Sequence, residues 1–177
     1  NATNGSSMSC WGMDFDGQLG NGVAGTSTTP VSVSAPSGTA GAQWSRTVGG
    51  LGHTCSVDKL SREIWCWGNN GFGQLGTGDL TSHAAPIDPV HTDSFAGFVA
   101  DYFLATGELA AGNNFTCMST PHQDTDDTDG KSRAHIYCWG KNDLGQLGYD
   151  ASTASSTDPL QPTSGKYVDA GLGIGQV

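Results

Sequence analysis

Positively charged side chains are scarce in this 177-residue sequence. Lys and Arg number 7 against 17 Asp and Glu, which gives a formal net charge of −10 at pH 7. Nucleic-acid binders need a basic footprint to neutralise phosphates, and anionic membrane surfaces attract basic segments. We therefore expect no nucleic acid and no anionic membrane among the partners, and we interpret the acidic balance as a solvated surface.

Long hydrophobic runs are also missing. A membrane-spanning helix needs about 20 consecutive apolar residues. The most apolar stretch, "FAGFVADYFLATGELAAG", is interrupted by Asp101 and Glu108, so we expect no membrane insertion in this segment. The sequence starts at Asn1 with neither an initiator Met nor a signal peptide, so we expect a processed or partial product.

Turn-forming residues, in contrast, are abundant. The chain has 27 Gly, about twice the average usage, while charged residues make up only 14%. Ser, Thr and Asn are also frequent, and Trp, Phe, Leu and Val suffice for a core. This composition is typical of a turn-rich β protein rather than a helical or disordered one.

One pattern, C-W-G followed by four residues and G-Q-L-G, occurs three times. The copies are "CWGMDFDGQLG" from Cys10, "CWGNNGFGQLG" from Cys66 and "CWGKNDLGQLG" from Cys138. The second interval is longer than the first, so the later unit carries an insertion. Repetition of this kind indicates an array of like structural units.

A fainter pattern, G-x-x-x-T-C, accompanies the first. It ends at Cys55 and Cys117, and "GLGIGQ" matches it near the end, with Gln176 at the cysteine position. The resulting repeat units lie near 8–55, 64–117 and 136–177. Short runs such as "REIWCWG" and "AHIYCWG" stop at Gly and indicate strands. Several short strands per unit, with glycines and an aromatic residue in fixed places, predict a β-propeller.

The W-G-x-N-x-x-G-Q-L-G-x-G signature resembles that of the regulator of chromosome condensation repeat family. The resemblance covers nearly the whole chain and implies blades of four antiparallel strands. Members form rings of about seven blades, whereas this sequence has roughly three repeats, so we expect an all-β partial propeller over residues 1–177. The cysteines indicate a secreted, disulfide-containing branch rather than the nuclear exchange factor.

Residues in register across the repeats are expected to pack between neighbouring blades. The set comprises Trp11, Trp67, Trp139, Leu19, Leu75 and Leu147. The alternative for a tryptophan is an exposed ring that binds carbohydrate. Trp44 and Trp65 lie outside the register and are the better candidates for that role.

The repeat frame pairs four of the five cysteines. We predict Cys55–Cys66 and Cys117–Cys138 disulfides, because cysteines on adjacent strands can come within bonding range. Cys10 is left with a partner outside the visible chain or as a free thiol. The alternatives are five reduced core cysteines or, less favoured because no C-x-x-C spacing occurs, a zinc site.

Three N-glycosylation sequons begin at Asn1, Asn4 and Asn114. Such tripeptides also arise by chance in Ser/Thr-rich chains. Together with disulfides, they favour an extracellular or cell-surface glycoprotein. Asn114 is the preferred acceptor, because Thr completes its sequon and the site lies in a turn.

The insertion "HQDTDDTDGKS" offers a cation site. Its carboxylates resemble a calcium loop, since hard cations prefer several oxygen ligands. The candidate ligands are Asp124, Asp126, Asp127 and Asp129. The spacing departs by one residue from D-x-D-x-D-G and no Glu closes the loop, so a solvated hairpin tip is the alternative. We expect no other cofactor.

No G-x-S-x-G, H-E-x-x-H or P-loop motif is present, so we expect no enzyme. We predict an extracellular structural or adhesive glycoprotein module, as a section or subunit of a surface coat or filament. Its partners would be other repeats of the same longer chain, or identical subunits. The alternative is a secreted or receptor-ectodomain propeller that binds a protein ligand.

Overall fold

The computed structural model of the protein describes residues 7–39, 41–90, 107–122, 133–149 and 154–160. These residues form nine strands: β1 (Ser9–Gly12), β2 (Ser27–Ser32), β3 (Trp44–Gly49), β4 (His53–Asp58), β5 (Glu63–Gly68), β6 (Glu108–Ala111), β7 (Phe115–His122), β8 (Arg133–Lys141) and β9 (Ser155–Leu160). Within the described ranges, no helix is long and apolar enough to cross a membrane.

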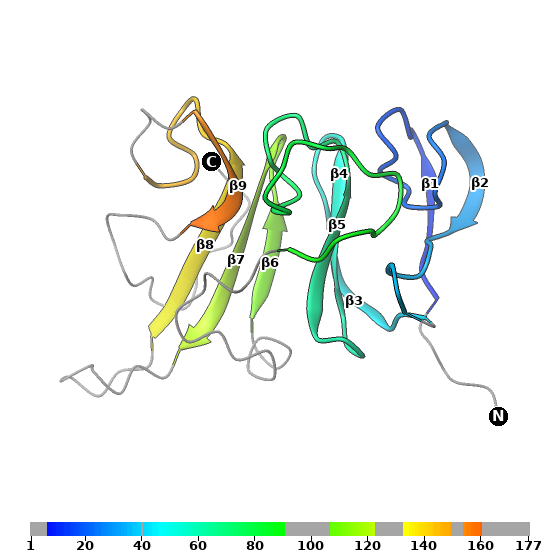
Figure 1. Ribbon diagram of the computed structural model, residues 1–177, viewed down its shortest axis with the longest axis horizontal. Helices are drawn as coiled ribbons and strands as arrows, with labels where there is room; N and C mark the ends of the chain where they lie inside the picture. The colour runs from blue at the N-terminus through cyan, green and yellow to red at the C-terminus, as the bar shows by residue number, and fades with distance from the viewer. Residues whose placement is uncertain (1–6, 40, 91–106, 123–132, 150–153, 161–177) are drawn as a thin grey trace.

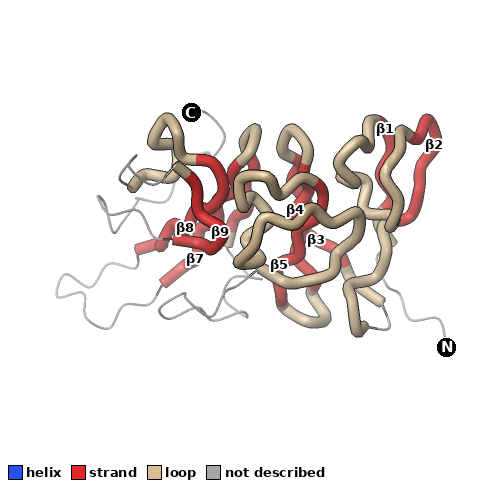
Figure 2. The backbone as a smooth tube through the Cα atoms, turned by 45° about the horizontal axis from the view of Figure 1, so that its top comes forward, coloured by secondary structure: helices blue, strands red, loops and turns tan. Residues whose placement is uncertain are grey.

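The strands form three antiparallel sheets that follow one another along the chain. The first contains β1 and β2, the second has the order β3-β4-β5, and the third has the order β6-β7-β8-β9. Figure 1 shows the sheets side by side in chain order, from blue to orange, and Figure 2 shows the same succession after a 45° turn. This arrangement confirms the predicted all-β class with antiparallel propeller blades.

The second sheet has a rudimentary fourth strand. Its outer strand β5 makes two isolated bridges, from Gly68 to His83 and from Trp65 to Pro89. The segment around Pro86 and Pro89 therefore lies beside β5 in the second sheet, as β9 lies beside β8 in the third sheet. Proline has no backbone N–H to donate, which explains why a continuous ladder does not form there.

The sheets are offset from the repeat units of the sequence. Each complete blade begins with a leading half, the strand pair β3-β4 or β6-β7, which carries the T-C pattern. A trailing half follows, and it starts with the C-W-G strand β5 or β8. The strands β1 and β2 form such a trailing half alone. A unit read from C-W-G to T-C therefore joins the trailing half of one blade to the leading half of the next.

A tight turn connects β4 to β5. The Asp58 carboxylate accepts hydrogen bonds from the backbone N–H groups of Leu60 and Ser61, both at 3.1 Å. It also accepts one from the N–H of Gln43 at 2.7 Å, which fixes the chain entering β3. Aspartate is common in turns because its short side chain can bond nearby backbone groups in this way.

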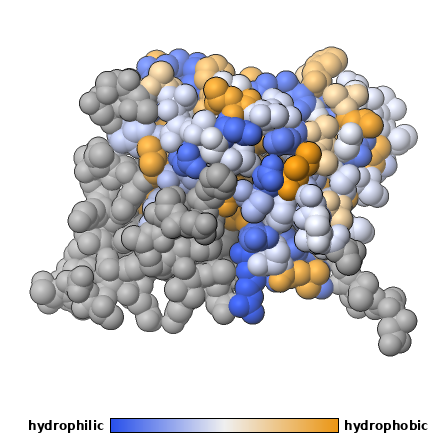
Figure 3. Space-filling model, in the orientation of Figure 1, coloured by the Kyte–Doolittle hydropathy of each residue, from blue (hydrophilic) through white to orange (hydrophobic). Residues whose placement is uncertain are grey.

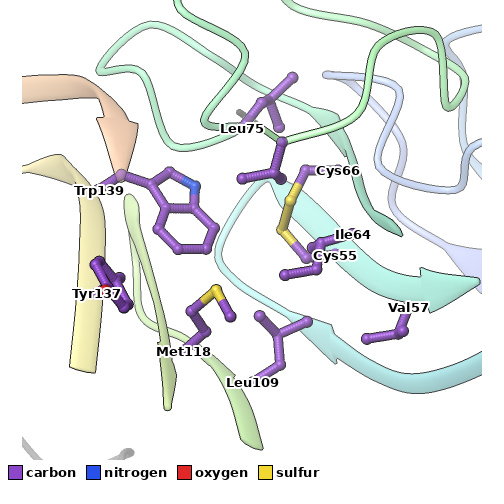
Figure 4. Packing of buried hydrophobic residues seen from close by; sticks show 10 residues of the cluster. Cys55, Val57, Ile64, Cys66, Leu75, Leu109, Met118, Tyr137 and Trp139 are labelled. Atoms are coloured by element: carbon purple, nitrogen blue, oxygen red, sulfur yellow. A yellow bond between two sulfur atoms is a disulfide. The ribbon is translucent and has the colours of Figure 1, made fainter. Parts of the chain in front are cut away.

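The main core lies between the second and third sheets. Figure 4 shows the Trp139 indole extending from β8 toward Leu75, with Met118 and Leu109 beneath it and the Cys55–Cys66 disulfide opposite. Trp139, Leu75 and Met118 are completely buried. Because the second and third sheets have their apolar faces against each other, these two blades stabilise one another.

Candidate functional site

Each G-Q-L-G segment is a turn held by a buried side chain from the end of the preceding strand. The Asn70 carboxamide oxygen accepts the Leu75 N–H at 3.0 Å, and Asn142 and Asp14 make the equivalent bonds to Leu147 and Leu19. All three polar residues are 0% exposed. A polar group can be buried in this way because it replaces the backbone partner that a turn lacks.

The glutamine of the motif braces the same turn. In the second copy, the Gln74 carboxamide oxygen accepts the Phe72 N–H at 2.9 Å, and its Nε2 donates to Asn69 Oδ1 at 2.8 Å. Gln18 and Gln146 accept the equivalent N–H groups at 3.0 and 2.9 Å. The polar groups of this glycine-rich segment are thus used within the fold.

The backbone carbonyl of the same glutamine joins one blade to the next. The Gln74 oxygen accepts hydrogen bonds from Trp139 Nε1 and from Thr116 Oγ1, both at 3.0 Å. In the preceding joint, the Gln18 oxygen accepts from Trp67 Nε1 at 3.0 Å and from Thr54 Oγ1 at 2.8 Å. The C-W-G tryptophan and the T-C threonine therefore act together as a paired donor.

A glycine is required where the indole meets the turn. Gly20 and Gly76 have φ values of +73° and +71°. A Cβ atom at Gly20 would lie 2.4 Å from Trp67 Nε1, and one at Gly76 would lie 2.7 Å from Trp139 Nε1. Both the left-handed backbone and the close approach exclude larger residues.

His53 links the second and third sheets. Its Nε2 lies 2.8 Å from Thr116 Oγ1, and the hydroxyl hydrogen of Thr116 is already donated to Gln74. The Nε2–H is therefore the donor, and the buried Nδ1 has no hydrogen-bond partner within the described part of the chain. Burial lowers the pKa of His53 to about 4, because a charged ring would lose its hydration there.

The structure contains two disulfides between neighbouring strands. Cys55 and Cys66 are directly opposite each other in the β4-β5 ladder, and Cys117 and Cys138 are opposite each other in the β7-β8 ladder. Both pairs are bonded, with Cα atoms 4.1 Å apart. Cys10, in β1, has a free thiol and is partly buried.

The expected packing of Trp11 needs correction. Trp67 and Trp139 are 0% exposed, as are Leu75 and Leu147, and Leu19 is 4% exposed, but Trp11 is 64% exposed. The reason is that each buried tryptophan lies against the G-Q-L-G turn of the preceding repeat. Among the described residues, no such turn precedes Trp11.

The two tryptophans outside the register are not exposed binding residues. Trp44 and Trp65 are 9% and 4% exposed and pack with Trp67, Met8 and Val33 between the first two sheets. The rings of Trp44 and Trp67 lie 5.4 Å apart between centroids. These indoles therefore belong to a joint between blades.

Several predicted sites fall outside the described residues. They are the sequons at Asn1 and Asn4 and the acidic set Asp124, Asp126, Asp127 and Asp129. The glycan and calcium assignments there stay predictions. In the described ranges, no group of three or more metal-ligating side chains occurs. Asn114 is half-buried in the β6-β7 turn, and its carbonyl accepts the Lys141 N–H at 2.9 Å.

A surface that the sequence did not single out lies where the C-W-G strands end. The registers His53–Gly68 and Phe115–Gly140 place the β3-β4 and β6-β7 turns at the same end of the sheets as the G-Q-L-G turns. Figure 1 shows these turns at the top. We call this surface the upper rim. Its exposed apolar side chains are Met13, Phe15, Leu51, Phe72 and Leu144.

The loops of the upper rim contact one another across the sheets. Asn69 Nδ2 donates to Asp16 Oδ1 at 2.9 Å, and the Leu51 N–H donates to the carbonyl of Asn113 at 3.1 Å. The Lys141 ammonium lies 5.1 Å from the centre of the Phe72 ring. Figure 3 shows apolar residues among polar ones at the upper end of the described surface. The rim is therefore one continuous surface.

A cavity of about 560 Å³ opens on the upper rim between the second and third sheets. It is lined by residues 49–51, 111–115 and 141–146 apart from Asn142 and Gly145. The apolar Leu51 and Leu144, exposed by 71% and 88%, lie beside an ion pair between Lys141 and Asp143 at 2.7 Å. The sequence feature that could have indicated this surface is the set of variable positions in W-G-x-N-x-x-G. Large apolar residues occur there within an otherwise polar turn.

Three sheets of like build, joined by a recurring turn, define a β-propeller repeat protein. Residues 63–118 match the family model described as the regulator of chromosome condensation (RCC1) repeat. This segment is thus similar to an RCC1 repeat, and the antiparallel sheets of the chain resemble the blades of RCC1-like β-propellers. Proteins with RCC1-like propellers are usually protein-binding modules.

Proteins similar in sequence or in fold align with most of this chain. The ultraviolet-B receptor UVR8 of Arabidopsis thaliana is 28% identical over 138 residues, which cover 78% of this chain and 26% of the receptor. Human WBSCR16 aligns with a TM-score of 0.60 at 19% identity, covering 90% of this chain and 34% of that one. Prp20p of Saccharomyces cerevisiae aligns with a TM-score of 0.57 at 21% identity, covering 90% and 35%. The chain thus spans about a third or less of each of these proteins.

Proposed function

We propose that this chain is a protein-binding module of an extracellular structural or adhesive glycoprotein, and that the upper rim is its contact surface. The observation that carries the proposal is the set of five large apolar side chains that the rim exposes, of which Leu51 and Leu144 line its cavity. Contiguous exposed apolar residues with a polar surround are typical of protein-interaction surfaces. Prp20p, by its title, has binding properties toward Gsp1p and histones, so a related propeller also binds proteins.

The two disulfides support the extracellular assignment. Disulfides persist in oxidising compartments and are rare in the reducing cytosol. The strongly acidic composition and the three sequons agree with a secreted glycoprotein. Intact mass before and after enzymatic deglycosylation would test this part: occupancy at Asn114 supports it, and an unmodified chain from the native source contradicts it.

The way in which the polar residues are used supports a non-catalytic role. The buried polar side chains of the G-Q-L-G turns and of the blade joints bond to the fold itself, as for Asn70 and His53. The two remaining charged residues at the cavity, Lys141 and Asp143, are solvent-exposed and form an ion pair with each other. Such a solvent-exposed pair lacks the desolvated environment that is typical of catalytic groups.

The rim can be tested with beads coated with the protein and cells of the source organism. The double substitution Leu51→Ser and Leu144→Ser removes the two most exposed apolar groups beside the cavity. We expect it to reduce bead retention at least tenfold. Leu60→Ser is the control, because Leu60 is 60% exposed on the β4-β5 turn at the other end of the sheets. Retention of the double variant at the wild-type level would contradict the proposal.

A second candidate is a secreted or receptor-ectodomain propeller that binds one protein ligand. The cavity favours it, because a concave site with paired charges suits a defined ligand better than a broad adhesive contact does. Surface-immobilised protein would separate the two roles. Adhesion in a coat or filament gives multivalent binding that weakens sharply when the chain is diluted on the surface. A receptor or inhibitor gives a saturable one-to-one complex at every density.

A further inference from the structure

The β6-β7 turn carries a side chain at a point where the β3-β4 turn has none. Asn114 occupies the place of Gly52, because both precede the first residue of an equivalent strand, β7 or β4. Their carbonyls also accept equivalent N–H groups, from Lys141 at 2.9 Å and from Asn69 at 2.7 Å. A Cβ atom at Gly52 would lie 2.8 Å from Asp16 Oδ2, so the β3-β4 turn has no free space for a side chain. Asn114, in contrast, lines the cavity of the upper rim.

The Asn114 carboxamide is free to carry a substituent. Asn114 is half-buried, and its side chain makes no hydrogen bond to any residue that the structure describes. Its polar neighbours in the cavity wall are engaged, since Lys141 is paired with Asp143 at 2.7 Å. Gln146 Nε2 also donates to Asp143 Oδ1, at 3.2 Å. A group attached to Asn114 Nδ2 therefore breaks no hydrogen bond of the described fold and starts from the wall of the cavity.

The threonine of the same sequon is buried in the joint between the second and third sheets. Thr116 is 0% exposed. Its Oγ1 donates to the Gln74 carbonyl at 3.0 Å and accepts from His53 Nε2 at 2.8 Å. The transferase that modifies a sequon must reach its hydroxyl residue as well as its asparagine. Because the closed joint withholds this hydroxyl, a sugar can be added to Asn114 only before the two sheets pack together.

We propose that a glycan on Asn114 caps the cavity of the upper rim, and that it is attached before the joint closes. Leu51 and Leu144 line the same cavity and are exposed by 71% and 88%. A bulky, hydrated glycan beside them would cover these apolar groups and exclude a protein partner. The rim would then be open only in molecules whose sequon stayed empty. The effect on partner binding rests on the function proposed for the rim, whereas the covering of the leucines does not.

The covalent step is a displacement at a sugar carbon. The donor is an oligosaccharide linked through a diphosphate to a membrane lipid. Asn114 Nδ2 forms a bond to C1 of the first sugar, and the bond from C1 to the diphosphate oxygen breaks. The lipid diphosphate leaves with that electron pair, and the carboxamide nitrogen loses one proton to a base of the transferase. Nothing is oxidised or reduced, so the step does not involve the disulfides.

The order of events can be tested on the whole chain with Asn1→Gln and Asn4→Gln, which leaves Asn114 as its only sequon. The unglycosylated protein, folded with both disulfides intact, is mixed with the transferase and its lipid-linked donor. The same chain after reduction and alkylation is the comparison. We expect transfer to Asn114 to be at least tenfold faster on the reduced chain, as measured by intact mass. Equal rates on the two forms would overturn the proposed order.

Capping is tested with three secreted proteins made in glycosylating cells, all with Asn1→Gln and Asn4→Gln. The first retains Asn114, and the second, the reference, has Asn114→Gln. The third is the reference with Lys59→Asn, which completes a sequon with the two residues that follow. Position 59 is exposed on the β4-β5 turn, at the other end of the sheets from the rim. The third protein therefore carries the same kind of glycan away from the cavity.

Hydroxyl-radical footprinting measures how far each leucine is covered. Oxidation of Leu51 and Leu144 should be at least fivefold lower in the first protein than in the reference, and unchanged in the third. In the third protein, Leu60 should be protected instead. Retention of coated beads by cells should fall at least tenfold for the first protein only.

An empty sequon at Asn114, or equal oxidation of Leu51 and Leu144 in the first protein and the reference, would overturn the capping proposal. The function proposed for the rim fails separately, if none of the three proteins is retained while Leu51 and Leu144 are still protected in the first. Equal retention of the first protein and the reference, with protection intact, would show that the cap does not control partner binding and would overturn that part.

Discussion

Trp139 Nε1 donates to the carbonyl oxygen of Gln74 at 3.0 Å, although the residues are 65 positions apart. The same relation, at the same distance, joins Trp67 to Gln18. The acceptor is a backbone atom, so substitution of the glutamine side chain leaves it in place. The geometry of the turn, rather than the identity of the glutamine, therefore determines whether two blades fit together.

The first prediction concerns two glycines in the same place of successive turns. Gly73 and Gly145 have φ values of +81° and +76°. A Cβ at Gly73 would lie 2.6 Å from the Ser156 carbonyl oxygen, whereas one at Gly145 would meet no atom of the described residues within 4 Å. Alanine should cost about 1–2 kcal/mol at either site because of the left-handed backbone. We expect Gly73→Ala to cost clearly more, measured by urea unfolding. Equal losses would show that the contact between blades adds nothing.

A second prediction concerns Asp14, whose carboxylate occupies the position that an asparagine carboxamide has in the other two turns. Asn70 Nδ2 donates to the Asp79 carbonyl at 3.0 Å, whereas Oδ2 of the equivalent Asp14 is buried without a partner among the described residues. Asp14→Asn should restore a donor and raise the free energy of unfolding by about 1 kcal/mol. The reciprocal Asn70→Asp should lower it by about 1–3 kcal/mol. Thermal melts of both variants check this, and a destabilised Asp14→Asn would refute it.

Acid should weaken the joint made by His53. Its pKa falls from 6.5 to about 4 on folding, so between these values the unfolded state binds more protons than the folded state. Stability is therefore complete above about pH 6.5 and is lost as pH falls toward 4, by up to roughly 3 kcal/mol. Denaturant midpoints at several pH values should show this loss. In His53→Gln, which retains a donor for Thr116, the slope in this window should be smaller.

The two disulfides should differ slightly in their contribution. Paired Cys→Ala substitution at Cys55 and Cys66, or at Cys117 and Cys138, should each cost about 2–4 kcal/mol. The second pair closes the longer loop, with a sequence separation of 21 against 11. Its removal should therefore cost about 0.6 kcal/mol more in the chain-entropy model. Urea unfolding of both double variants is the measurement, and a larger loss for the first pair would contradict that model.

The repeated positions were the part of the fold that the sequence could predict. Leu75, Leu147 and Trp139 recur in register because each blade meets its neighbour through the same atoms, and such periodicity is visible without coordinates. Trp11 occurs in the same sequence motif but is exposed. A local motif specifies what a residue can contact, whereas its burial depends on whether the neighbouring turn is present.

The upper rim and the burial of Trp44 were not predictable in the same way. Phe72 and Leu144 occupy variable positions of the turn, and only the hydrogen-bonding register shows that these positions meet at one end of the sheets. Trp44 lies outside the repeat pattern, yet it packs against Trp67 because β3 begins beside the first sheet. Contacts of this kind depend on how blades are placed in space, which periodicity does not specify.

The offset between sequence units and blades has a consequence for how such a chain can change its length. A deletion of residues 66–137 would remove one unit and place Cys138 where Cys66 was, opposite Cys55 in the ladder. The rejoined halves would form a whole blade with its cysteine pair intact. Recombination between like C-W-G segments can therefore alter the copy number of units, while the rejoined blade retains its four strand positions.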